Sequence, residues 1–135
     1  MPRMHFLQMA CEKLAKAHLC GVNAPLENVQ TSHAYVASTL PVVLRQQALS
    51  LNFSGRAAKT ALAEAKHLAR EIELLSPSVN AGGKRPDNCE YPWEDENGVL
   101  RSPLEWAFNP SRLLLARSGR SMLKLLRGAV ENWQK

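Results

Sequence analysis

The chain has 135 residues, and its 17 Lys and Arg residues outnumber its 12 Asp and Glu residues, which gives a formal net charge of +5. Apolar residues make up 45% and charged residues 21% of the chain, proportions that predict one soluble globular domain over residues 1–135. No apolar run approaches the roughly 18 residues that a membrane-spanning helix needs, so the sequence excludes transmembrane proteins and we expect no membrane partner.

The cysteines and the N-terminal residues favour a cytoplasmic protein. Glu12, Lys13 and Lys16 interrupt the first apolar residues, which is unlike a secretory signal peptide. The chain has three cysteines, an odd number, and no Cys-x-x-Cys pair that could anchor a zinc site. The acidic residues around position 95 lack the spacing of a calcium loop, and no glycine-rich phosphate loop is present. We therefore expect no metal and no other cofactor.

Apolar periodicity predicts two helices before residue 50. The first covers residues 4–19 and the second residues 31–49, where Pro41 is expected to kink the helix or divide it in two. The buried stripe expected for the first helix is Phe6, Leu7, Ala10, Cys11, Leu14, Ala17 and His18. The buried stripe expected for the second helix is His33, Val36, Ala37, Leu40, Val43, Leu44 and Ala48.

The clearest helix is the third, over residues 55–75, with Ser54 as its capping residue. Its alanines allow a close approach of neighbouring helices. The buried stripe expected for it is Ala58, Ala61, Leu62, Ala65, Leu68, Ala69, Ile72 and Leu75.

Residues 76–102 lack the apolar periodicity of a helix and are rich in Gly, Pro, Asn and Asp. Residues 89–93 and 99–101 could pair as a small hairpin around the turn at 95–98. A short helical piece is expected at 104–108, and a last helix at 111–133 with a break near Gly119. The predicted fold is therefore all-α, an antiparallel four- to five-helix bundle with a long loop or a small β-hairpin insert near residues 76–102.

Four cations of the last helix form a strip on its polar side. Arg117, Arg120, Lys124 and Arg127 fall within an arc of about 80° on a helix. Such a strip can contact successive phosphates of a nucleic acid. The alternative is a solvated face that is partly neutralised by the acidic loop of the same chain or of a partner.

One histidine and two aromatic residues are further site candidates. His33 is expected at the N-terminus of the second helix, where a neutral imidazole is favoured and could act as a base or as a structural hydrogen-bond partner. Tyr91 and Trp93 flank Pro92 in the long loop. They form a platform for stacking on bases if exposed, or plug the end of the bundle if buried.

Residues 6–19, which read FLQMACEKLAKAHL, resemble the opening core helix of HEPN-type domains, and His33 near the start of the next helix is also similar to that superfamily. The resemblance covers about a third of the chain. It implies a helical bundle, often dimeric, in bacterial defence or toxin–antitoxin systems. Many members are metal-independent ribonucleases with an Arg followed four to six residues later by a His. This chain has no such pair, so the resemblance implies the scaffold without the catalytic motif.

Three functions remain open on the sequence. The first is a non-catalytic HEPN-like domain that binds nucleic acid or a nucleotide, or acts through a partner protein; its contacts are the four cations of the strip, with Tyr91 and Trp93. The second is a metal-independent ribonuclease with a divergent site, in which His33 is the base. The third is a structural or interaction module, in which the acidic loop of one subunit meets the basic strip of another.

Overall fold

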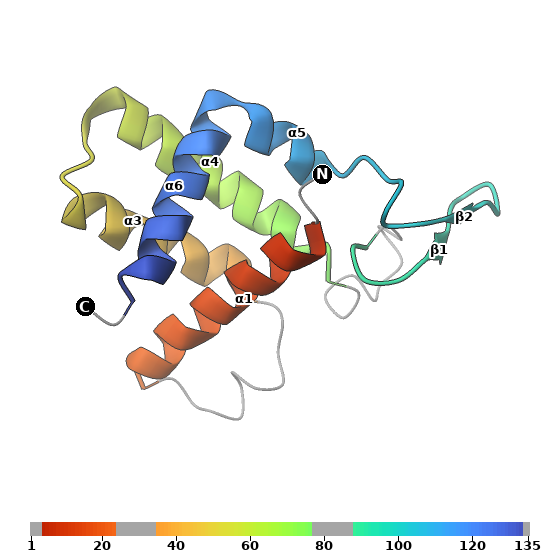
Figure 1. The fold of residues 1–135 in the computed structure, drawn as a ribbon, viewed down its shortest axis with the longest axis horizontal. Helices are drawn as coiled ribbons and strands as arrows, with labels where there is room; N and C mark the ends of the chain where they lie inside the picture. The colour runs from red at the N-terminus through yellow and green to blue at the C-terminus, as the bar shows by residue number, and fades with distance from the viewer. Residues whose placement is uncertain (1–3, 24–34, 77–87, 134–135) are drawn as a thin grey trace.

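The computed structural model describes residues 4–23, 35–76 and 88–133. Within them the chain forms five helices and one two-stranded antiparallel hairpin (Figure 1). The elements are α1 (Met4–Gly21), α3 (Val36–Ser50), α4 (Gly55–Glu73), β1 (Trp93–Glu94), β2 (Leu100–Arg101), α5 (Asn109–Leu115) and α6 (Arg117–Glu131). The predicted all-α bundle with a small hairpin is confirmed.

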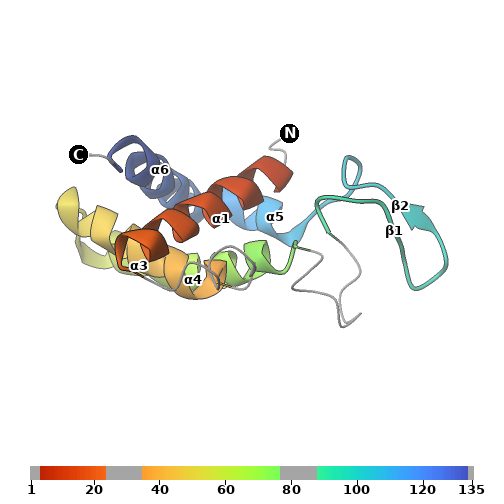
Figure 2. The ribbon, with the colours of Figure 1, turned by 90° about the horizontal axis from the view of Figure 1, so that it is seen from below.

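The helices pack in two layers. The turn at residues 51–54 joins α3 to α4, and these two helices form an antiparallel pair. The helices α1 and α6 cover one side of this pair (Figure 2). The core between the layers includes Leu40, Leu44, Leu68, Ile72 and Met122, each less than 2% exposed.

The prediction for α4 is confirmed almost residue by residue. Every member of its expected stripe is buried, except that Leu62 is half-buried at the edge of the core. Ser54 occupies the N-cap position, although its side chain makes no capping hydrogen bond. The small alanine side chains bring α4 close to its neighbours.

The buried face of α1 differs from the predicted one. Phe6 was expected in the core but is 60% exposed, whereas Glu12, which lies outside the expected buried stripe, is only 7% exposed. The reason is a row of polar side chains around Glu12: Gln8 Nε2 donates to Glu12 Oε2 at 2.9 Å, and Lys16 Nζ lies 3.0 Å from Glu12 Oε1. A hydrogen-bonded and ion-paired carboxylate can be buried, which a count of apolar residues does not detect.

The helix α3 is one continuous helix with Pro41 inside it, so of the two alternatives predicted for Pro41, a kink or a division, the division into two helices does not occur. The expected start at Thr31 or Ser32 and the position of His33 lie outside the described residues. The first turn of α3 is capped from another helix. Glu73 of α4 accepts a hydrogen bond from the backbone N–H of Ala37 at 3.2 Å.

The last helix is broken as predicted, but the helix expected at 104–108, the start expected at residue 111 and the position of the break differ from the structure. Residues 104–108 are not helical, and Pro110 lies inside the first turn of α5, where its fixed φ is suited to a helix start. The helix break falls at Ala116, whose ψ is 159°, rather than at Gly119. Gly119 is needed for another reason: a Cβ atom there would lie 2.6 Å from the Cα of Leu114, so the glycine allows α6 to fold back tightly on α5.

The hairpin is shorter than predicted, with Trp93 opposite Arg101 and Glu94 opposite Leu100. Asp95 organises its turn. Its Oδ1 accepts hydrogen bonds from the backbone N–H groups of Asn97 and Val99, each at 2.9 Å, and its Oδ2 lies 2.7 Å from Arg101 Nη2. Both views show the hairpin projecting from one end of the bundle (Figures 1 and 2).

Candidate functional site

The strip of cations predicted on the last helix is exposed on α6. Arg117, Arg120, Lys124 and Arg127 all lie on its solvent side, because Met122, Leu125, Leu126 and Ala129 of the same helix face the core. The strip is about 15 Å long, at 1.5 Å per helical residue. That length corresponds to about four nucleotides at ~3.4 Å per step of one strand.

Few carboxylates lie close enough to the strip to neutralise its positive charge. Arg127 Nε lies 2.7 Å from Glu131 Oε1, and this hydrogen bond to the carboxylate raises the pKa of the guanidinium. No carboxylate of the described residues pairs with Arg117, Arg120 or Lys124. Three cations of the strip are therefore open to an external anion.

The acidic hairpin of the same chain does not neutralise the strip. Asp95 is bound to Arg101 within the hairpin. The hairpin projects from one end of the molecule, whereas α6 runs toward the other end (Figure 1). The alternative in which a chain neutralises its own strip is not supported.

The two aromatic candidates lie in different environments. Trp93 is 8% exposed and packs edge-to-face on Trp106, with ring centroids 5.4 Å apart, and on Phe108 at 6.2 Å. Its indole therefore plugs the base of the hairpin and presents no free face for a base to stack on, contrary to its inclusion among the contact residues. Tyr91 is 62% exposed. It belongs to the hairpin end of the molecule rather than to the α6 strip.

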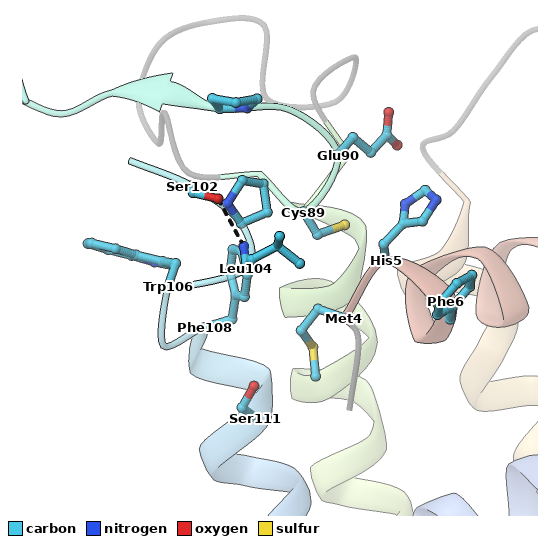
Figure 3. A pocket seen from close by; sticks show the side chains of 12 residues that line it. Met4, His5, Phe6, Cys89, Glu90, Ser102, Leu104, Trp106, Phe108 and Ser111 are labelled. Carbon is cyan, nitrogen blue, oxygen red and sulfur yellow. Dashed lines mark hydrogen bonds between the residues drawn. The ribbon is translucent and has the colours of Figure 1, made fainter. Parts of the chain in front are cut away.

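A cavity of about 680 Å³ lies where the first turn of α1 meets the segments on either side of the hairpin (Figure 3). Phe6, Leu104, Trp106 and Phe108 give it an apolar wall, and the backbone N–H of Leu104 donates to Ser102 Oγ at 3.3 Å. His5 contributes a buried Nδ1 atom that has no hydrogen-bond partner among the described residues. The sequence did not single out this cavity, because His5 reads as a polar residue near the end of the chain.

Cys89 also lines this cavity but is not a nucleophile. Its Sγ lies 3.8 Å from the backbone carbonyl oxygen of Leu75, and burial, with a smaller contribution from Glu90, raises the pKa of the thiol to about 12. At neutral pH the thiolate, which is the reactive form, is almost absent. The cavity therefore offers no activated cysteine beside His5.

A second basic surface lies on the outer side of the α3–α4 pair. A groove of about 700 Å³ runs between these helices, with Arg45 of α3 and Lys59 and Lys66 of α4 among its lining residues. No single stretch of sequence carries this pattern, because the three cations come from two helices and are 21 positions apart at most. The sequence pattern therefore did not predict the groove.

Metal binding and membrane insertion find no support in the described part of the chain. It holds no group of three His, Cys, Asp or Glu side chains that could bind a metal ion. None of its helices is both long and apolar enough to cross a membrane. The chain matches no protein-family model, no curated protein and no solved structure.

Proposed function

We propose that the protein binds nucleic acid without cleaving it, through contacts between the exposed cations of α6 and the phosphate backbone. The observation that carries this proposal is that Arg117, Arg120 and Lys124 are exposed on one face and lack a carboxylate partner among the described residues. A row of unpaired cations gains affinity for a polyanion by releasing the counterions of its phosphates. The binding is expected to depend on backbone charge rather than on base sequence.

The HEPN resemblance supports RNA as the nucleic acid, and it supports a cytoplasmic defence or toxin–antitoxin system as the setting. Within this proposal, the resemblance predicts only which kind of helical scaffold the protein has. The missing Arg–His spacing supports binding without catalysis. Tyr91, which is exposed at the hairpin end, is a secondary candidate for stacking on an unpaired base.

The test is a titration of a fluorescein-labelled 12-nucleotide single-stranded RNA, followed by fluorescence anisotropy at several salt concentrations. Three phosphate contacts predict a slope of about −2 for log K against log salt, at ~0.7 per contact on a single strand. The double variant Arg120→Glu, Lys124→Glu is expected to lose at least about tenfold in affinity and to flatten the slope to about −0.7, the value for one remaining contact.

The matched control is Lys59→Glu, Lys66→Glu, which changes the net charge by the same amount in the α3–α4 groove on the other layer. If both double variants lose the same affinity, the overall charge binds RNA and the α6 strip has no special role. Gel analysis of the same RNA after incubation tests cleavage. Cleavage that is lost in His33→Ala would overturn the non-catalytic proposal in favour of a divergent ribonuclease.

A further inference from the structure

The hairpin and the α3–α4 groove are complementary in charge. The tip of the hairpin, defined here as residues 94–100, exposes the carboxylates of Glu94 and Glu96. The groove presents Arg45, Lys59 and Lys66, and no Asp or Glu of the described residues lines it. Opposite charges on two surfaces of this size favour their association and exclude wrong registers.

The two surfaces also match in their apolar parts. Leu100 is 74% and Val99 is 46% exposed on the hairpin tip, so both present apolar surface to solvent. The floor of the groove contains Pro41, Leu62 and the 46%-exposed Val42. Docking of the tip would remove these side chains from water while the charges pair around them.

The tip is held in shape before any partner arrives. Asp95 binds the backbone N–H groups of Asn97 and Val99 and the guanidinium of Arg101, so the turn is closed by its own carboxylate. Arg101 lies over the ring of Trp106 at 5.7 Å, which ties the hairpin to the buried aromatic cluster at its base. A preformed element loses less conformational entropy on binding than a flexible loop does.

The tip does not contact the groove of its own chain, whose lining residues come from α3 and α4 alone. It projects from one end of the molecule, and the turn that joins α3 to α4 lies at the opposite end (Figures 1 and 2). Arg45 and Lys59 lie near this turn, six residues before Leu51 and five residues after Ser54. A tip at one end and its receptor toward the other end are the arrangement of a head-to-tail contact between two copies.

We propose that the protein self-associates head-to-tail, with the acidic hairpin tip of one copy seated in the basic α3–α4 groove of the next. This contact is distinct from the α6 strip, which stays free for nucleic acid. A pair joined by one such contact retains one open tip on one copy and one open groove on the other, so further copies can add to it, whereas a symmetric dimer leaves neither surface open. The tip has seven residues, residues 94–100, fewer than the roughly 20–30 that a stable interface uses on each side, so we expect a weak contact that depends on concentration.

The test is sedimentation velocity over a range of protein concentrations, at about 50 mM and about 200 mM salt. The wild-type protein is expected to show a weight-average mass that rises continuously with concentration at low salt and falls at higher salt. A single mass equal to the monomer throughout, or a discrete dimer with no further growth, would overturn the proposal.

Charge exchange identifies the two surfaces. The variant Glu94→Lys, Glu96→Lys reverses the charge of the tip, and the variant Lys59→Glu, Lys66→Glu reverses the charge of the groove. All four side chains are exposed, so both variants are expected to fold. Circular dichroism checks that they do. Each variant alone is expected to be monomeric. An equimolar mixture is expected to associate again, because each tip then meets a groove of opposite charge. Failure of the mixture to associate would overturn the pairing.

The same variants separate this proposal from the nucleic-acid proposal. Arg120→Glu, Lys124→Glu is expected to lose RNA binding and to keep the concentration-dependent mass. If it instead becomes monomeric, the acidic tip binds the α6 strip and the groove assignment is wrong. Loss of RNA binding in that variant says nothing against head-to-tail association, so the two proposals can fail independently.

Discussion

Glu73 near the end of α4 binds the backbone N–H of Ala37 in the first turn of α3, with 3.2 Å between Oε1 and the nitrogen. The N-cap residue Tyr35 makes no side-chain capping hydrogen bond. The carboxylate of Glu73, which is 4% exposed, therefore caps a helix to which it is not adjacent in sequence. It also lies 3.3 Å from Arg70 Nη1. One side chain thus joins the end of one helix to the start of another.

Replacing this carboxylate should destabilise the bundle. Glu73→Ala leaves the N–H of Ala37 without an acceptor and removes packed atoms, at a cost of about 1–2 kcal/mol in the free energy of unfolding. Glu73→Gln keeps a carbonyl acceptor and is expected to lose less. Urea unfolding followed by circular dichroism measures both. Glu131→Ala, which removes a mostly exposed ion pair with Arg127, is the control and should leave the urea midpoint almost unchanged.

Gly119 is expected to tolerate no side chain. In Gly119→Ala the new Cβ would lie 2.6 Å from Leu114 Cα, and backbone atoms of α5 cannot yield as a flexible side chain can. The helices must separate, which costs about 1–3 kcal/mol of stability. Gly21→Ala is the matched control, since its Cβ meets nothing within 4 Å, and thermal unfolding compares the two. Equal melting temperatures would contradict the close approach of α5 and α6.

The order of the hairpin tip should depend on pH through Asp95. Hydrogen bonds from the backbone N–H of Val99 first, and then from Arg101 and Asn97, hold the pKa of this carboxyl below its ordinary value of 3.8. A carboxyl with a lowered pKa stabilises the folded turn above its ordinary pKa, and this stabilisation is lost as pH falls through the lowered value. The amide NMR signals of Asn97 and Val99 are therefore expected to stay constant down to about pH 4 and to shift only below it. A transition at or above the ordinary pKa would contradict the assignment.

Only one of the three cysteines should react readily with a thiol reagent in the folded protein. Cys20 is exposed, whereas burial raises the pKa values of the Cys11 and Cys89 thiols to about 12. At pH 8 a thiol with that pKa is ionised in only about one molecule in 10⁴. A disulfide reagent is expected to label one thiol quickly and the other two only on unfolding. Cys20→Ser should abolish the fast phase; a fast phase that persists would show that Cys11 or Cys89 is accessible.

Periodicity predicted the helices best where small and apolar residues alone form the buried face. In α4 the alanines and leucines repeat without interruption, so helix and buried stripe both follow from the sequence. In α1 the face is rotated because Gln8 and Glu12 are buried as a hydrogen-bonded pair. A hydropathy pattern assigns such residues to solvent, since it cannot know that each has a partner.

The candidate surfaces also differ in whether the sequence could predict them. The α6 strip follows from helical spacing within one element, so the exposure of Arg120 and Lys124 could be predicted. The groove around Arg45 and Lys66 could not be predicted, because it depends on how two helices pair. The burial of Trp93 against Trp106 likewise depends on a contact between segments whose geometry no local pattern encodes.

Among the described residues, the projecting hairpin places exposed negative charge at one end of the molecule. The exposed carboxylates of Glu94 and Glu96 lie at one end, and the cations of the helical layers lie away from it. In the field of a polyanion such a molecule experiences a torque that turns the hairpin outward before contact is made. Encounters are then biased in orientation as well as in frequency, and this bias should weaken as added ions shorten the screening length to below about 10 Å.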